Sequence, residues 1–414
     1  MTSTLIWTIS LLSIGGVIIR PFKTPEVFWA MGGAALILLL GLLPPIEGWK
    51  GITKGTDVYL FLTGMMLLAE TAREEKLFDW LAGQATSLAK GSPGRLFALI
   101  YGVGIMVTVF LSNDATAVVL TPAVVAAMRA AKVKKPLPYL LICAFIANAA
   151  SFVLPISNPA NLVIYGSRMP PLGHWLALYG LPSVLSIGVT FGVLRWTQRR
   201  ALQQPIEAAV DLPPLASGGK TALWGILLAA VALLVCSALD IQLGLPTAIT
   251  GILTSALVLL RAKKKPWVVV QGVSWSVIPL VAGLFVIVEA LGKTGVIQVL
   301  SGWLRTGLTH SVAGTAWAGG WLVALAANGM NNLPAGLITG QLMQDGQVPE
   351  TVKSAVLIGV DLGPNLSITG SLATILWLVA LRREGLSVSA RDFLKVGVVV
   401  MTSALAAALA ALWL

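Results

Sequence analysis

Long apolar runs of about 17 to 25 residues recur along the whole chain, and this recurrence limits the possible folds more than any other feature. Each run can cross the roughly 30 Å hydrocarbon core of a bilayer as one helix. Hydrophobic residues make up 57% of the 414 positions and charged residues only 11%, far below the charged fraction of about 25% in soluble domains. The sequence therefore predicts an all-α polytopic membrane protein with about ten spanning helices.

The spans are expected where an apolar run has few charged residues. They lie near residues 5–19, 26–44, 57–72, 137–167, 175–195, 221–239, 245–262, 272–292, 351–381 and 391–413. Two further segments, 95–130 and 311–343, are too long for one straight helix and are interrupted at their centres by SNDAT and NGMNNLP. Each is either a pair of full crossings or a re-entrant hairpin whose tip stops near the midplane. In both cases the two ends of the segment lie on the same side of the membrane.

The basic residues are distributed unevenly over the loops between these spans. If the N-terminus is outside, 22 of the 28 Lys and Arg residues lie on the inner side. This bias satisfies the positive-inside rule, so the formal charge of +11 is explained by membrane topology and nucleic-acid binding is not expected. The same topology places both termini outside, with the chain in contact with membrane lipid along every span.

The apolar segments form two related halves separated by a polar linker. The linker, residues 201–220, contains Pro, Gly and charged residues between long apolar runs and is expected in the cytoplasm. Each half, 1–200 and 221–414, contains one long interrupted segment followed by one broken helix: 95–130 and 137–167 in the first, 311–343 and 351–381 in the second. The sequence therefore predicts an internal repeat.

Two stretches match between the halves: GMMLLAETAREEKLFDWLA from Gly64 and GLFVIVEALGKTGVIQVLS from Gly283, which place Glu70 and Glu289 at the same spacing. The loop charges put the start of the first half outside and the start of the second half inside, so the repeat is predicted to be inverted. Inverted repeats with paired interrupted helices are the architecture of secondary transporters, whose substrates bind near the midplane between the halves.

Four breaks interrupt the helices of the two halves. In hydrocarbon an unpaired backbone amide or carbonyl is costly, so non-helical backbone survives at membrane depth only where it is buried in protein or lines a watery cavity. An asparagine or proline at one break could simply kink and bridge helices, but four breaks in two matched pairs favour one lined cavity. The residues expected around it are Asn113, Asn158, Asn161, Asn331, Asn332, Asn365, Ser112, Thr116, Ser157, Ser367 and Thr369.

Asp114 is a carboxylate within one of these breaks, and Asp361 is its counterpart in the second half. An ionisable group at the bilayer centre costs at least about 3 kcal/mol and marks a functional site by default. Neither aspartate has a Lys or Arg within its own helical segment at membrane depth. We predict that Asp114 and Asp361 couple transport to protons or cations; the structural alternative is that Asp114 caps the half-helix that begins at Ala115.

The remaining acidic residues of the apolar segments have a structural interpretation. Glu70 and Glu289 lie at span ends near Arg73 and Lys293, so we expect them to form interfacial ion pairs. The chain contains no nucleotide-binding motif, and it is therefore not expected to hydrolyse ATP itself. The driving force must come from an ion gradient or from a separate ATPase.

The histidines and cysteines are not expected to carry chemistry. His174 and His310 fall in outside loops and should not form a relay through the membrane, and Cys143 and Cys236 lie in apolar runs and are interpreted as packing residues. Accordingly no metal site and no cofactor are predicted. No Arg or Lys lies at the four breaks, so a neutral solute rich in hydroxyls, or a cation, fits this site better than an anion.

Four motifs stand out in the two halves: FLSNDATAVVLTP, ISNPANLVIYG, NNLPAGLITG and GVDLGPNLSITGSLATILW. They resemble the motifs of the ArsB-type arsenite and antimonite efflux permeases, in the wider ion transporter superfamily. The resemblance covers essentially the whole chain. It implies export of trivalent arsenite or antimonite across the inner (plasma) membrane of a bacterial or archaeal cell, in exchange for protons and by alternating access. A cytoplasmic arsenic-stimulated ATPase is an optional partner, and the two long interrupted segments are implied to be hairpins with their tips at the substrate site.

The residues agree with that substrate. Near neutral pH arsenite is mostly As(OH)3, an uncharged triol that a cage of amides and hydroxyls can hydrogen-bond without a cationic clamp. More distant members of the superfamily carry dicarboxylates and bear Ser-Asn-Thr at both hairpin tips, whereas these tips read Ser-Asn-Asp and Met-Asn-Asn. Two alternatives remain: a sodium/proton antiporter of the same superfamily, with Asp114 as a cation ligand, and a channel-like pore gated by a partner.

Overall fold

The computed structural model describes residues 2–21, 24–207, 214–343 and 348–414. Within these ranges the chain is helical and contains no β-strand, as predicted. Six helices are long and apolar enough to cross a membrane, and a bent pair brings the number to seven. The other apolar runs are divided into shorter helices by turns and breaks. Lys23, one of the predicted inner basic residues, and positions 208–213 of the predicted linker lie outside the described residues.

The first part of the chain forms eleven α-helices. They are α1 (Thr2–Ile19), α2 (Glu26–Leu39), α3 (Pro45–Lys54), α4 (Thr56–Glu74), α5 (Leu77–Ala89), α6 (Pro93–Phe110), α7 (Asn113–Ala115), α8 (Thr121–Ala130), α9 (Leu137–Ala149), α10 (Pro159–Tyr165) and α11 (Leu172–Thr197).

The second part forms ten more. They are α12 (Ser217–Ala238), α13 (Gly244–Ala262), α14 (Trp267–Gly272), α15 (Val277–Gly292), α16 (Val296–His310), α17 (Val312–Met330), α18 (Asn332–Met343), α19 (Glu350–Leu362), α20 (Leu372–Arg383) and α21 (Ala390–Ala411). The bent pair is α15 and α16, whose axes differ by 73°.

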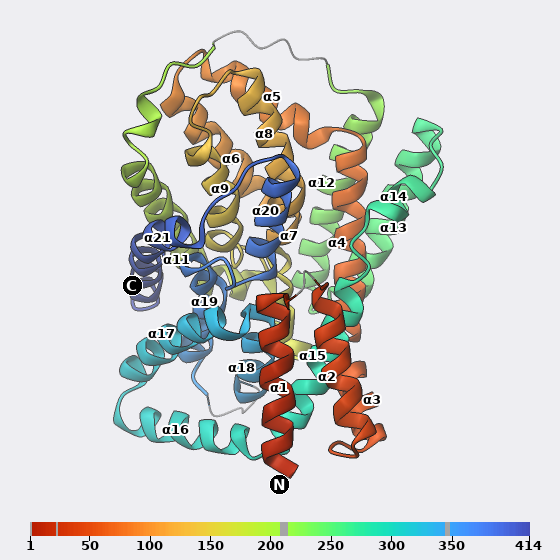
Figure 1. Cartoon of the computed structure of the whole chain (residues 1–414), viewed down its shortest axis with the longest axis vertical. Helices are drawn as coiled ribbons and strands as arrows, with labels where there is room; N and C mark the ends of the chain where they lie inside the picture. Colours follow the sequence, from red (N-terminus) through yellow and green to blue (C-terminus); the bar gives the residue numbers. More distant parts are fainter. Residues whose placement is uncertain (1, 22–23, 208–213, 344–347) are drawn as a thin grey trace.

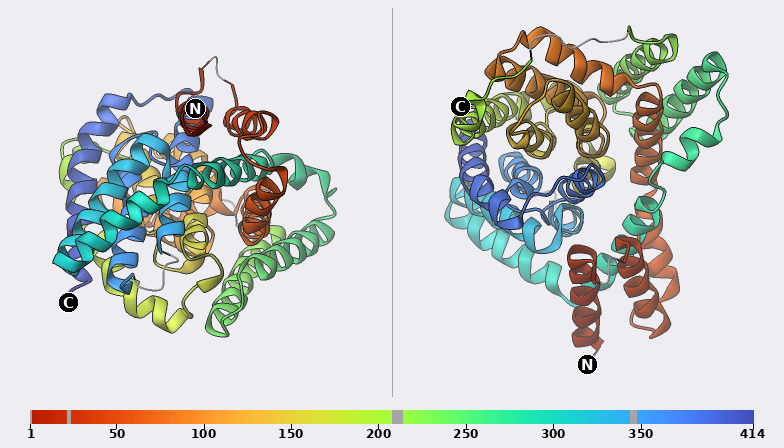
Figure 2. Two further views of the ribbon diagram at one scale, coloured as in Figure 1. Left: turned by 90° about the horizontal axis from the view of Figure 1, so that it is seen from below. Right: turned by 45° about the horizontal axis from the view of Figure 1, so that its top comes forward.

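The helices gather into two bundles that lie side by side (Figure 1 and Figure 2). The lateral bundle contains α1 to α4 and α12 to α15, in which α4 packs along α13 and α2 packs along α15. The broken-helix bundle contains α6 to α11 and α17 to α21, in which α17 packs on α19, α11 on α21 and α10 on α18. Each bundle therefore takes helices from both parts of the chain.

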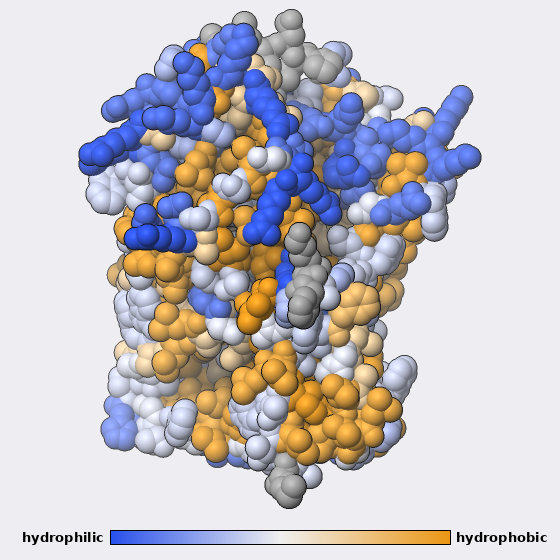
Figure 3. Space-filling model, in the orientation of Figure 1, coloured by the Kyte–Doolittle hydropathy of each residue, from blue (hydrophilic) through white to orange (hydrophobic). Residues whose placement is uncertain are grey.

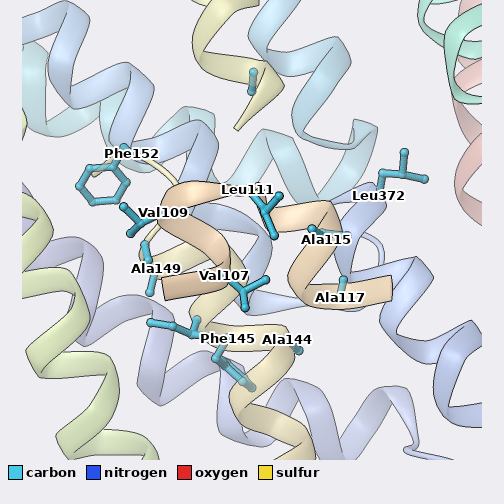
Figure 4. Packing of buried hydrophobic residues seen from close by; sticks show 14 of the residues in the cluster. Val107, Val109, Leu111, Ala115, Ala117, Ala144, Phe145, Ala149, Phe152 and Leu372 are labelled. Atoms are coloured by element: carbon cyan, nitrogen blue, oxygen red, sulfur yellow. The ribbon is translucent and has the colours of Figure 1, made fainter. Parts of the chain in front are cut away.

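Local chemistry explains where the first long segment breaks. Helix α6 ends at Phe110, and Ser112 begins a new helix by accepting a hydrogen bond from the backbone N–H of Ala115 at 3.1 Å. The new helix passes through one π-helical turn, Thr116–Leu120, directly before Pro122, whose ring nitrogen has no hydrogen to donate to the preceding turn. The break lies among buried apolar side chains that include Leu111 and Ala115 (Figure 4).

Hydrophilic residues gather at one end of the molecule, and broad apolar surfaces cover the rest of the face seen in Figure 3. Helix α5 and the adjoining end of α4 lie at this hydrophilic end (Figure 1). Many large apolar side chains elsewhere are exposed, including Leu12, Leu39, Leu253 and Leu260. Exposed apolar surface of this extent is characteristic of a protein that contacts lipid.

Candidate functional site

Asp114 lines a cavity between the two bundles. On the lateral side the cavity is bounded by Phe61, Met65 and Glu70 of α4, and on the other side by Ser112 and Asp114. No basic residue of the described chain lines it. The walls are otherwise largely apolar, so a carboxylate and a hydroxyl are the polar groups that the broken-helix bundle presents to this space.

The carboxylate of Asp114 is not used to hold the fold. The cap of its helix is Ser112, and the Asp114 backbone N–H donates to Asn113 Oδ1 at 2.9 Å. Among the residues that the structure describes, no group donates a hydrogen bond to the Asp114 carboxylate. The structural alternative, in which Asp114 caps its own half-helix, is therefore wrong. The side chain is partly exposed, toward the cavity.

Asp361 has a different environment. Its side chain is fully buried, and the two carboxylate oxygens accept hydrogen bonds from Ser151 Oγ at 2.6 Å and from Asn158 Nδ2 at 2.8 Å. Asn158 also caps α10, because its Oδ1 accepts the backbone N–H of Ala160 at 3.0 Å. Asp361 thus joins the break before α10 to the end of α19, in the other half of the chain.

A second set of hydrogen bonds joins the same two broken helices. Asn148 Nδ2 donates to Asn365 Oδ1 at 3.0 Å, and Asn365 Nδ2 donates to the carbonyl of Phe145 at 3.1 Å. Ser371 Oγ donates to Asn148 Oδ1 at 3.3 Å, and its own oxygen caps α20 at Thr374. All these polar side chains are buried, so their hydrogen bonds hold the crossing of the broken helices in one geometry.

The second long segment breaks at Asn331, whose φ of 74° is unusual for a residue with a side chain. Such backbone strain persists only where surrounding contacts impose it, and it concentrates at functional sites. Here the adjoining backbone is fixed to the broken helix, because Asn332 N–H donates to the carbonyl of Gly370 at 2.9 Å. Asn328, in the last turn of α17, donates through Nδ2 to the carbonyl of Gly363 at 2.9 Å.

The polar side chains at this second break bond to one another as well. Ser367 Oγ donates to Asn328 Oδ1 at 2.6 Å and lies 3.1 Å from Thr369 Oγ1. The Thr369 hydroxyl donates to the Asn328 carbonyl at 3.2 Å. These hydroxyls, which the sequence predicts as cage members, therefore tie the tip of the second long segment to the nearby break.

The remaining predicted site residues face protein. Ser157 Oγ donates to the carbonyl of Val109 at 3.1 Å, Thr116 Oγ1 lies 2.8 Å from Thr108 Oγ1, and Asn161 Nδ2 donates to the carbonyl of Ser151 at 3.0 Å. Of the predicted residues, Ser112 and Asp114 line the cavity. The others brace the breaks around it, and in the described part of the chain no hydrogen bond joins Asn113 to Asn331.

Sequence reasoning missed Asn148, Asn328 and Ser371, which complete these networks. The asparagine distribution could have identified the first two. The chain has eight asparagines, and every one lies in or beside one of the four breaks. Asparagine is absent from the uninterrupted helices, so its presence marks the places where backbone N–H and C=O groups need hydrogen-bond partners.

Both glutamates form ion pairs, as predicted, but the partner of Glu289 is not the nearby Lys293. Arg73 holds Glu70 through Nε to Oε2 at 2.8 Å, as expected. Glu289 pairs with Lys54 at 2.7 Å, while Lys293 pairs with Glu47. The reason is that α3 packs against α15 and brings Lys54 over the carboxylate.

Cys143 is fully buried and its thiol bonds weakly to the carbonyl of Tyr139, at 4.0 Å, as a packing residue does. Cys236 is partly buried and unbridged. His174 is exposed and contacts Glu350 at 2.9 Å. His310 ends α16, where Nδ1 lies 2.7 Å from the carbonyl of Thr306.

Replacing Asn365 with Ala is expected to lower the free energy of unfolding by about 2 kcal/mol, because it removes two buried hydrogen bonds, one from Asn148 Nδ2 to Asn365 Oδ1 and one from Asn365 Nδ2 to the carbonyl of Phe145. The loss should appear as a lower melting temperature of the purified protein in detergent. The control is Thr402→Ala, which removes an exposed hydroxyl bonded only within its own helix. Equal melting temperatures for the two variants would show that the amide network does not hold the broken helices together.

The comparisons with known proteins agree with a membrane transporter. A sequence model of the CitMHS family, described as citrate transporter, matches residues 14–359. The arsenical pump membrane protein of Yersinia enterocolitica is 28% identical over 403 residues, which cover 92% of this chain and 91% of that protein. The protein of the same name from Escherichia coli (strain K12) is 28% identical over 404 residues, with the same coverage of 92% and 91%.

Two solved structures have a similar fold. The YdaH transporter of Alcanivorax borkumensis aligns with a TM-score of 0.58 at 16% identity, covering 88% of this chain and 86% of that one. MtrF of Neisseria gonorrhoeae, described among antimetabolite efflux pumps, aligns with a TM-score of 0.54 at 14% identity, covering 100% and 94%. The predicted resemblance to ArsB-type permeases is confirmed by the arsenical pump relatives. The chain is therefore a membrane transporter rather than an enzyme, and it belongs to the CitMHS family.

Proposed function

We propose that this chain exports trivalent arsenite or antimonite from the cytoplasm in exchange for protons. The observation that carries the proposal is the cavity between the bundles, where Asp114 and Ser112 face largely apolar walls and no described lining residue is basic. The names of the arsenical pump relatives support the substrate. The carboxylate supplies the proton-binding group that exchange requires, because nothing in the described chain donates a hydrogen bond to it.

The chemistry of arsenite suits this cavity better than that of citrate, the substrate named for the family. As(OH)3 is neutral and carries three hydroxyls, each of which can donate to a carboxylate and accept from a hydroxyl or amide. A tricarboxylate would need Arg or Lys side chains as counter-charges, and the described lining supplies none. The negative charge of Asp114 would repel it further.

We infer that the two halves are an inverted repeat, with 1–200 and 221–414 joined by a cytoplasmic linker. Helix packing supports this inference: α4 lies along α13, and α15, which occupies the matching position of the second half, lies along α2. The matched glycines Gly64 and Gly283 lie in these two contacts, against the backbones of Thr247 and Ala30 respectively.

The membrane arrangement follows from the same inference. The segments 95–130 and 311–343 form re-entrant hairpins, because each turns at a break braced by a broken helix rather than at a polar loop. The basic loops face the cytoplasm and both termini face outward. The chain resides in the inner, or plasma, membrane of a bacterial or archaeal cell.

Export then proceeds by alternating access between the two bundles. The cavity lies at their boundary, so a movement of the broken-helix bundle against the lateral bundle opens it to one side and then to the other. Asp114 takes up a proton while the cavity faces outward and gives that proton up inside, after which arsenite is bound and carried out. An arsenic-stimulated ATPase on the cytoplasmic side is an optional partner, since a proton gradient supplies the driving force without it.

The proposal is tested with everted membrane vesicles, whose lumen corresponds to the outside of the cell. We expect rapid uptake of arsenite into vesicles with an acidic lumen, in the absence of ATP, and collapse of that uptake when a protonophore is added. Vesicles from cells without the chain provide the baseline. Uptake indifferent to the protonophore would indicate a channel-like pore. Sodium-driven proton movement without arsenite uptake would indicate a sodium/proton antiporter, and either result would overturn the proposal.

A further inference from the structure

A polar pocket opens at the start of α11 and α19, at the surface that the proposed topology places outside. Its lining includes Tyr165, His174, Glu350 and Lys353. His174 Nε2 lies 2.9 Å from Glu350 Oε1, and both side chains are exposed. The pocket therefore brings an imidazole and a carboxylate, two groups that can bind protons, into contact with solvent at the start of α19.

A stripe of polar residues leads inward from this pocket along α19. Glu350, Ser354 and Asp361 are separated by four and then seven residues, which places all three on one face of the helix. Ser354 and Asp361 are both fully buried. At a rise of 1.5 Å per residue, Ser354 and Asp361 are roughly 10 Å apart along the helix axis.

A matching stripe lies on α10, which packs against α19. Asn158, Asn161 and Tyr165 follow one another at spacings of three and four residues, again on one face. The two stripes meet at the inner end, where Asn158 Nδ2 donates to Asp361 Oδ1 at 2.8 Å. We call this seam of six residues, three from each helix, the polar seam.

Tyr179 of α11 closes the outer end of the polar seam. Its hydroxyl lies 2.7 Å from the Tyr165 hydroxyl, and Ser354 lies near both phenols without a hydrogen bond to either. The ring of Trp175 lies 4.4 Å from that of Tyr179, and the Trp175 indole N–H donates to the carbonyl of Phe152 at 3.2 Å. The phenols are therefore held in fixed positions between the pocket and the membrane interior.

Two atoms on the polar seam have no hydrogen-bond partner in the described chain: Ser354 Oγ and Asn161 Oδ1. What distinguishes these two atoms is their place between the phenols and Asp361 on two facing stripes. The Ser354 hydroxyl can accept one proton while it releases its own, and Asn161 Oδ1 can hold a water molecule by accepting one of its hydrogens. The neighbouring ionisable groups are the two phenols, and no described Lys, Arg or His bonds to Asp361.

We propose that the polar seam is the route by which protons from outside reach Asp361. A proton taken up at His174 and Glu350 moves to the Tyr165 phenol as that phenol passes its own proton to Tyr179 and Tyr179 passes its own to the Ser354 hydroxyl. Ser354 in turn gives up its proton, through a water molecule that hydrogen-bonds to Asn161 Oδ1, to the Asp361 carboxylate. Each hydroxyl then again holds one proton, and Asp361 becomes a carboxylic acid. Asp361 lies next to the transport cavity, because Asn158, its hydrogen-bond partner, precedes Pro159 in the cavity wall. This inference rests on the proposed function, because it assumes that protons are the ion that drives transport.

Infrared spectroscopy tests this route without arsenite. The protein is reconstituted in one orientation in proteoliposomes with a buffered lumen, the outer pH is lowered rapidly, and the carboxyl band that Asp361→Asn removes is followed. Tyr179→Phe keeps the ring but lacks the hydroxyl, so the carboxyl band should grow about tenfold more slowly. A tenfold change in rate corresponds to the loss of about one buried hydrogen bond from the polar seam. Tyr101→Phe is the matched control, since its buried phenol donates to the carbonyl of Ile187 far from the seam.

Ser354→Ala provides a second test, with Ser10→Ala as its control, because both serines are buried and their hydroxyls lack a partner in the described chain. Slower growth of the band in the seam variants alone supports the route. Equal rates in all four variants, or the absence of any band that depends on Asp361, would overturn it. If unmodified protein fails to take up arsenite in vesicles while the seam variants still slow the band, the proposed substrate is wrong and the proton route stands.

Discussion

Replacing Asp114 with Asn is expected to reduce proton-driven arsenite uptake by about a hundredfold or more, the range seen when a proton-transferring side chain is removed. An amide has nearly the same shape as a carboxylate and still hydrogen-bonds a triol, but it cannot take up a proton in this range of pH. The substitution should leave folding intact, because no described group donates a hydrogen bond to the Asp114 carboxylate.

The measurement compares initial rates of arsenite uptake into everted vesicles at a fixed pH gradient, normalised to the amount of protein. Asp392→Asn is the matched control, since that carboxylate is exposed at the start of α21 and binds Ser389 and Lys395 rather than the cavity. A second assay follows exchange of labelled arsenite across the membrane at equal pH, which needs no net proton transfer and should persist in Asp114→Asn. If gradient-driven uptake survives in this variant, the coupling role belongs to Asp361.

The backbone breaks of the fold could be predicted because their causes are local. Ser112 caps a helix three residues before Ala115, and Pro122 disturbs the turn before it, so the sequence alone indicates an interruption there. The same holds for Asn331, where three asparagines and a glycine lie within six residues before Pro334. Apolar length and loop charge similarly indicate a multi-pass helical protein.

The partners of the side chains could not be predicted, because they depend on how distant segments pack. Asn148 and Asn365 are 217 residues apart and meet only where two broken helices cross. Asp361 looks equivalent to Asp114 in the sequence, yet Ser151 and Asn158 hold it inside the protein while Asp114 faces the cavity. One predicted cage therefore separates into a small group that lines the cavity and a larger group that holds the breaks in place.

The contacts of α4 with α13 and of α15 with α2 explain why a glycine recurs at the matched positions of the two halves. A Cβ built on Gly64 would lie 2.1 Å from the backbone oxygen of Thr247, and one on Gly251 would lie 2.5 Å from the backbone oxygen of Gly64. Backbone atoms cannot rotate away as the end of a side chain can, so the two helices must separate to admit even a methyl group. Helices in lipid have no hydrophobic force to bring them together. Small residues at such crossings let the backbones approach closely, and the van der Waals contacts then hold the helices together.

Gly64→Ala is therefore expected to lower the free energy of unfolding by about 3 kcal/mol, at the upper end of the cost of overpacking. Gly283→Ala should act in the same direction with a smaller effect, because its Cβ would lie 2.8 Å from the backbone of Ala30. The control is Gly188→Ala in the middle of α11, where a Cβ meets nothing within 4 Å and alanine favours the helix. Thermal unfolding in detergent separates the cases: Gly188→Ala should melt at or above the temperature of the unmodified protein, and Gly64→Ala well below it. A Gly64→Ala protein as stable as the Gly188→Ala protein would mean that α4 and α13 do not touch through their backbones. That result would also contradict the packing argument for the inverted repeat.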